Sequence, residues 1–257
     1  MKKTCITLVA TVMFILTSCG SGKDENLLES QGPEQIIPTE YQEEFNKSNN
    51  NENLYETSIN QNNLTSNLLD VQCILQNPEL PTGCEITSLA IVLNYYGYDI
   101  TKTELASKYL EKDYSGKVPF DVAFMGDPTW DQGFGCFAPV IVKAAQNYLN
   151  EKNMEHTAWN MTGTDFSELY NYIDDGKPVI VWASMDLMNV NKRFIIKSDD
   201  GREIYWYDNE HCMVLCGYDK NENTVTVADP LKGMMKYNAE RFEYIYDTLE
   251  KQAIIIE

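Results

Sequence analysis

Cys84, His211 and Asp229 are residues of the types that form a nucleophile, its general base and a group that orients the base. Cys84 follows Pro81 and Gly83 and directly precedes the apolar run EITSLAIVLNYYG, so its thiol should lie at a helix N-terminus. Unpaired N–H groups and the helix dipole stabilise negative charge there, and a nearby imidazolium would lower the thiol pKa further. The thiolate is the form that attacks a carbonyl carbon. This spacing predicts a reactive cysteine at residue 84.

The base must be one of only two histidines, His156 and His211. His211 opens the apolar strand HCMVLCGYD, which is a rigid support for a catalytic group, whereas His156 lies at a polar boundary and reads as a surface or structural residue. The next strand ends in VTVADP, and antiparallel pairing around the turn at 219–223 would bring Asp229 beside His211. Asp229 would then accept the imidazole N–H and fix its tautomer.

An oxyanion needs hydrogen-bond donors, and Gln76 lies eight residues before Cys84, close enough for its amide to act with the Cys84 backbone N–H. Cys136 is a rival nucleophile, because it also follows a glycine and precedes a long helix. Each of these signals alone has an ordinary structural explanation. Their combination in this order predicts a catalytic site.

Four stretches resemble successive blocks of the C39-like cysteine peptidase family, papain-fold relatives of the enzymes that process bacteriocin leaders. They are QNPELPTGCEITSLAIVLNYYG, GDPTWDQGFGCFAPVI, GKPVIVWAS and HCMVLCGYDKNENTVTVADP. The resemblance implies a papain-like fold, with catalytic roles for Cys84, His211 and Asp229 and the oxyanion position for Gln76. It also favours a substrate groove over a plain loop for GDPTWDQGFG.

The elements that must position these residues follow from periodicity. Four helices are expected: one at 85–97, one that begins after an N-cap at Thr101, one at 138–151 and one at 165–176. Strands dominate after residue 178, and residues 253–256 could add an edge strand. This order predicts an α+β papain-like cysteine protease fold in which N-terminal helices pack on a C-terminal antiparallel sheet. The aromatic residues of its strands, Trp182, Tyr205 and Trp206, read as core by default, with a binding platform as the alternative.

The chain start has the layout of a bacterial lipoprotein signal, with two lysines, an apolar run and small residues ending at Cys19. We expect a signal peptide at 1–18, a lipidated Cys19 with a polar tether at 19–69, and one peptidase domain at 70–257. An ordinary cleaved signal or an uncleaved anchor is the alternative. The lipid would hold the protein outside the cell membrane, an extracytoplasmic location.

The remaining cysteines number five, and an odd count in an exported domain indicates at least one free thiol. Cys212 and Cys216 share a strand at a spacing too long for a disulfide, so they read as core, while the pairing of Cys73 stays open. The sequence has no paired CxxC motifs, and we expect neither a metal site nor a cofactor.

The net charge of −19 argues against nucleic acid as a partner and against electrostatic adsorption to anionic lipid. The expected partners are therefore a peptide or protein substrate and, through the lipid on Cys19, the membrane. Three functions fit: a thiol hydrolase of peptide or amide bonds, an acyltransferase using the same triad, and a surface-binding module without turnover. Substrate and oligomeric state do not follow from the sequence.

Overall fold

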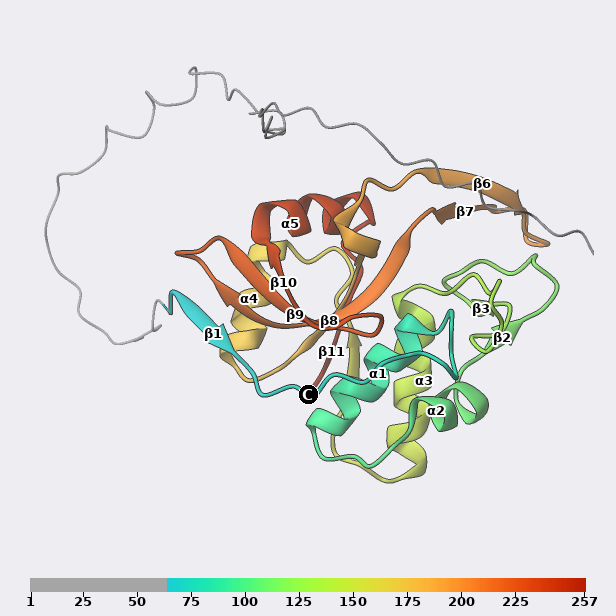
Figure 1. Cartoon of the computed structure of the whole chain (residues 1–257). Coiled ribbons are helices and arrows are strands. Elements are labelled where there is room, and N and C mark those ends of the chain that lie inside the picture. Colours follow the sequence, from blue (N-terminus) through green and yellow to red (C-terminus); the bar gives the residue numbers. More distant parts are fainter. Residues whose placement is uncertain (1–63) are drawn as a thin grey trace, which may run out of the picture. The chain divides into compact units, whose positions relative to one another are not determined.

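An antiparallel sheet forms the centre of the part of the chain that the computed structural model describes, residues 64–257 (Figure 1). In spatial order its strands are β10 (Gly233–Asn238), β9 (Thr224–Asp229), β8 (Glu210–Asp219), β5 (Val179–Ser184), β11 (Ala253–Ile256) and β4 (Ala158–Asn160). β1 (Ser66–Leu68) also pairs with β8. All but the last residue of β8 are buried, because this central strand is covered on both faces.

Helices cover both faces of this sheet. α1 (Cys84–Tyr95), α2 (Lys102–Lys108) and α3 (Ala138–Glu151) lie together on one side, and α4 (Phe166–Asp174) and α5 (Ala239–Thr248) lie on the other (Figure 1). α1 packs mainly on β8, so the helix that begins at Cys84 contacts the strand that carries His211.

Two small pairs of strands lie outside the main sheet. β2 (Lys112–Asp113) pairs in parallel with β3 (Phe124–Met125), and β6 (Lys192–Lys197) forms a hairpin with β7 (Glu203–Tyr207). A short 3₁₀ helix (Met185–Leu187) follows β5.

The α+β papain-like fold class is confirmed, and so are the expected helices. α3 spans the predicted residues, and Thr101 caps α2 by accepting a hydrogen bond from the Glu104 N–H at 3.1 Å. The expectation of an edge strand at 253–256 is wrong, because β11 lies between β5 and β4 and all its residues are buried. Its run Ala-Ile-Ile-Ile is typical of a strand covered on both faces.

Residues before the expected domain boundary at 70 take part in the fold. Ser66 pairs with Asp219 and Leu68 with Gly217, so β1 lies within the segment 19–69 assigned to the tether. This strand is held by main-chain pairing at the surface, which requires no apolar side-chain pattern.

The expected signal peptide at 1–18 and the lipidated Cys19 lie outside the described residues. Within residues 64–257, no helix has the length and apolar character needed to cross a membrane.

Candidate active site

Cys84 is the first residue of α1, and Gly83 directly before it occupies the N-cap position. A Cβ atom on residue 83 would lie 2.8 Å from the Leu80 Cβ and 3.0 Å from the Pro128 Cβ, so only glycine fits this close approach. No side chain caps the helix, which leaves its first N–H groups directed at the nucleophile turn. Cys84 itself is buried, with 8% of its surface exposed.

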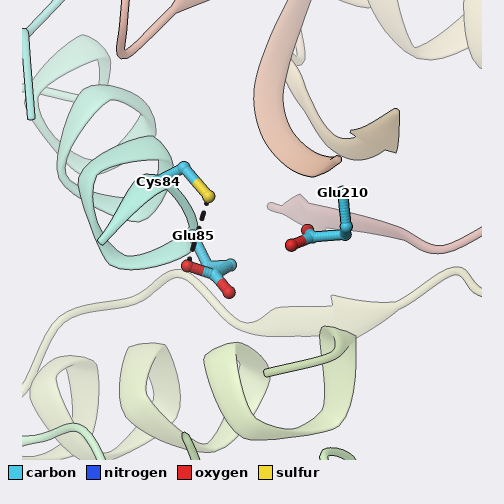
Figure 2. A group of neighbouring side chains, drawn as sticks. All are labelled: Cys84, Glu85 and Glu210. Atoms are coloured by element: carbon cyan, nitrogen blue, oxygen red, sulfur yellow. Dashed lines mark hydrogen bonds between the residues drawn. The ribbon is translucent and has the colours of Figure 1, made fainter. Parts of the chain in front are cut away.

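The Cys84 thiol donates a hydrogen bond to Glu85 Oε2 at 3.3 Å, and the other oxygen of this carboxyl accepts from the Cys136 N–H at 2.8 Å. Glu85 is completely buried, and this burial raises its pKa to about 7. Glu210 also approaches the thiol, and burial followed by the charge of Glu85 raises its pKa well above the ordinary value. Two carboxyl groups therefore surround the thiol (Figure 2).

The thiol pKa differs from the sequence-based expectation. Burial, and then the carboxylates of Glu85 and Glu210, raise the pKa of Cys84 well above its ordinary value, so the predicted lowering is wrong for this geometry. The physical reason is that the thiol is buried, and that the charged groups raising its pKa are carboxylates. The Cys212 main-chain N–H opposes the shift without reversing it.

His211 and Asp229 form a buried hydrogen-bonded pair, with His211 Nε2 at 2.7 Å from Asp229 Oδ1. Burial alone would raise the pKa of Asp229, but hydrogen bonds from His211 and from the Leu231 and Lys232 main chain outweigh it and lower the pKa. The Asp229 carboxylate can only accept, so His211 Nε2 carries the proton and Nδ1 is left as an acceptor. Tyr237 also donates to this carboxylate, at 3.5 Å.

The structure brings the thiol to the strand that carries His211, next to the main chain of Cys212. Within the described residues, however, no hydrogen bond joins Cys84 to His211, because the thiol is turned towards Glu85. Catalytic hydrogen bonds are often open before substrate binds. The catalytic roles of Cys84, His211 and Asp229 remain predictions.

Gln76 is buried between the nucleophile turn and the end of β9. Its main-chain N–H donates to the Pro230 carbonyl at 2.8 Å, and its side-chain Nε2 donates to the Pro81 carbonyl at 2.7 Å. Its side-chain oxygen has no hydrogen-bond partner within the part of the chain that the structure describes. The amide thus lies beside the turn that precedes Cys84, and its role in the oxyanion site remains a prediction.

Cys136 is completely buried, and its main chain is fully engaged. Its N–H donates to Glu85, and its carbonyl accepts from the Trp182 indole at 3.1 Å. A thiol with no exposed surface cannot approach a peptide, so this burial argues against Cys136 as the nucleophile. Across residues 64–257 all five cysteines are free thiols.

His156, the other histidine, lies between α3 and β4, where its Nδ1 is hydrogen bonded to the Tyr98 hydroxyl and its ring packs on Tyr96.

The glycine-rich segment 126–135 packs on the nucleophile turn, and Thr82 Oγ1 donates to the Trp130 carbonyl at 3.0 Å. A Cβ atom on Gly135 would lie 2.4 Å from Glu85 Oε1. This segment therefore forms the wall that holds Glu85 and the turn.

The aromatic residues of the strands divide between core and surface. Trp182 is 1% exposed and lies in the main core, and Trp206 stacks on Phe137 with ring centroids 5.9 Å apart. Tyr205 lines a cavity of about 310 Å³ beside the β6–β7 hairpin, together with Lys192 and Arg202. Neither Cys84 nor His211 lines this cavity, so the catalytic assignment rests on the geometry of α1 and β8.

An α+β fold with a cysteine at the first turn of a buried helix and a His–Asp pair on the facing sheet defines a papain-like cysteine peptidase architecture. Residues 68–254 match the family described as "Peptidase_C39 like family", and the chain belongs to this family. The family membership predicted from the resemblance is therefore confirmed.

Individual relatives agree with this assignment. The chain is 32% identical to "Uncharacterized protein YvpB" of Bacillus subtilis (strain 168) over 186 residues, which cover 70% of this chain and 71% of that protein. It is similar in structure to a putative C39-like peptidase from Bacillus anthracis, with 29% identity, a TM-score of 0.65, and coverage of 75% and 97% of the two chains.

A more distant likeness is to a double glycine motif protease from an AMS/PCAT transporter, solved in complex with the leader peptide. The identity is 19%, the TM-score is 0.40, and the match covers 74% of this chain and 91% of that one.

Sequence reasoning missed Glu85, Glu210 and Tyr237. The first two carried a usable signal, because each is an acidic residue beside a predicted site residue within an otherwise apolar, buried element. Ionisable residues are seldom fully buried without a specific partner. Tyr237 carried no such signal, since its contact depends on the pairing of β9 with β10.

Proposed function

We propose that this protein is an extracytoplasmic, membrane-anchored cysteine peptidase that cleaves a peptide or amide bond through Cys84, His211 and Asp229. The observation that carries the proposal is the buried His211–Asp229 hydrogen bond of 2.7 Å on the strand that faces the start of α1. A buried pair of this kind orients the imidazole and stabilises its protonated form.

In the proposed reaction the Cys84 thiol rotates about its Cα–Cβ bond from Glu85 towards His211 Nδ1. Nδ1 takes the thiol proton, and the thiolate forms a bond to the carbonyl carbon of the substrate. The tetrahedral intermediate collapses as the imidazolium gives its proton to the leaving amine, which breaks the amide bond. Water then hydrolyses the thioester with His211 again as the base.

The negative oxygen of the intermediate needs donors that are already in place. The free N–H groups at the start of α1 are one source, and the Gln76 amide is the other. Its Nε2 has two N–H groups, of which one is donated to the Pro81 carbonyl. The docking of Gln76 on Pro230 supports this role, because it fixes the amide to the end of the strand that carries Asp229.

Incubation of the full-length protein with a peptide library, read by mass spectrometry, tests this function. We expect cleavage products that disappear in the Cys84→Ala variant and persist in Asn147→Ala, a change at an exposed residue of α3. Amide products formed only with an added amine would instead indicate an acyltransferase. The absence of any turnover or covalent intermediate at Cys84 would indicate a binding module and overturn the proposal.

A further inference from the structure

Three side chains with atoms that can bind a metal ion lie together beside the first turn of α1: Cys84, Glu85 and Glu210. The Cys84 sulfur and one carboxylate oxygen from each glutamate all lie within 4.8 Å of one another, and all three residues are buried. Figure 2 shows the Glu210 carboxyl extending from its strand towards the Cys84 thiol and the Glu85 carboxyl on α1. The three side chains converge from two different elements.

Glu210 provides an independent observation that points to a ligand at this cluster. It is 8% exposed, and its Oε1 is buried without a hydrogen-bond partner among residues 64–257. A buried polar atom without a partner destabilises a fold, and more so when the group is charged.

We propose that Cys84, Glu85 and Glu210 form a binding site for a divalent transition-metal cation of the Zn²⁺ class. A thiolate and two carboxylates suit Zn²⁺, which binds such ligands at about 2.0–2.3 Å. Tetrahedral coordination at that length separates neighbouring ligand atoms by about 3.3–3.7 Å, and the Cys84 sulfur is already 3.3 Å from Glu85 Oε2. Small side-chain movements would bring Glu210 to the same distance.

The surroundings of Glu85 support this site. Its Oε1 is held by the Cys136 N–H at 2.8 Å, which orients Oε2 towards the thiol. Hydrogen bonds of this kind fix metal ligands and raise affinity. Three protein ligands leave a fourth position for water. Binding forms metal–sulfur and metal–oxygen bonds and releases the thiol and carboxyl protons to solvent, without any change of oxidation state.

A cation held here would make the Cys84 sulfur unavailable for reaction with a carbonyl or an alkylating reagent. The site itself does not require that the protein be a peptidase. If Cys84 is the nucleophile proposed above, the cation acts as a reversible inhibitor of that activity. Metal binding and catalysis can therefore be tested separately.

Two readouts on the full-length protein test the site without any substrate. Co²⁺ should produce a thiolate-to-metal charge-transfer band in the near ultraviolet, which Cys84→Ala abolishes. Zn²⁺ at about ten times its dissociation constant should slow iodoacetamide labelling of Cys84 by about tenfold, since some one-tenth of the sites stay free. EDTA should restore the rate.

The isosteric variant Glu210→Gln distinguishes this site from one formed by Cys84 and His211. In Glu210→Gln, the labelling rate of Cys84 should be nearly the same with and without Zn²⁺. In Glu168→Gln, a change at an exposed residue of α4, Zn²⁺ should still slow labelling by about tenfold. Circular dichroism confirms that each variant is folded. Absence of the Co²⁺ band in the wild type, or Zn²⁺ protection that persists in a folded Glu210→Gln variant, would overturn the proposal.

Discussion

The Cys84 thiol has two sets of neighbours at the residue scale. Its present hydrogen bond is to Glu85, and burial with two carboxyls raises its pKa. The His211–Asp229 pair joins β8 to β9 through His211 Nε2, which leaves Nδ1 as the acceptor for the thiol proton in the proposed reaction. The proposed enzyme is therefore at rest as a neutral thiol, and it becomes reactive when that thiol turns to His211.

Replacement of Asp229 by Asn tests the orienting role of the carboxylate. The amide can donate to His211 Nε2 and so favour the wrong tautomer, which should reduce kcat/KM for peptide cleavage by roughly 10³-fold or more. Asp199→Asn is the control, because that side chain is 83% exposed. Equal activity of Asp229→Asn and wild type would contradict the assignment.

The same carboxylate makes stability depend on acid pH. Its folded-state pKa lies below the ordinary value of 3.8, so it stabilises the fold fully above that value and loses this contribution as pH falls through the folded-state pKa. Urea unfolding should show wild type more stable than Asp229→Asn at pH 7, with the difference shrinking in strong acid. A difference that is constant with pH would show that the carboxylate's charge is not responsible.

At the scale of elements, the start of α1 is fixed by close packing against the turn before it and the segment 126–135. Gly83→Ala would place a Cβ atom 2.8 Å from the Leu80 Cβ, and relief of that clash should lower the free energy of unfolding by about 1–3 kcal/mol. Asn147→Ala, at an exposed residue, should change it little. Chemical denaturation measures the free energy of unfolding of both variants. An unchanged denaturation midpoint in Gly83→Ala would show that the turn is not tightly packed.

The elements nearest the site were the ones that the sequence predicted well. The helices α1 and α3 and the strands β8 and β9 have strong apolar patterns because they are buried against one another. α5 was missed, since its Phe, Tyr, Ile and Thr residues favour strands and its helical state depends on packing against the sheet. Short surface strands such as β1 depend on pairing alone.

The candidate site was only partly predictable for a related reason. Residue order placed His211 and Asp229 on paired strands, and the structure has them hydrogen bonded. The approach of Glu210 to Cys84 joins β8 to α1, a tertiary contact that no local spacing encodes. The thiol pKa is raised first by burial and then by the carboxylates of Glu85 and Glu210, and that burial arises from tertiary packing. The sequence-based expectation of a lowered pKa was therefore wrong.

At the scale of the whole molecule, the proposed location depends on Cys19, which precedes the described domain. Cys19→Ser should prevent lipid attachment and move the protein from the membrane pellet to the soluble fraction, because the net charge of −19 opposes adsorption to anionic lipid. Metabolic labelling with a radioactive fatty acid, followed by fractionation, measures both effects. A labelled Cys19→Ser protein would show that the lipid is attached elsewhere.

In the proposed mechanism, His211 activates Cys84 as a nucleophile for acyl transfer. Trapping of the acyl-enzyme tests this most directly: the full-length protein is mixed with an activated acyl ester, quenched in acid and mapped by peptide mass spectrometry. We expect acylation of Cys84 in the wild type, none in Cys84→Ala, and a rate reduced at least about 10²-fold in His211→Ala. Acylation of Cys136 instead, or of Cys84 at an equal rate in His211→Ala, would contradict it.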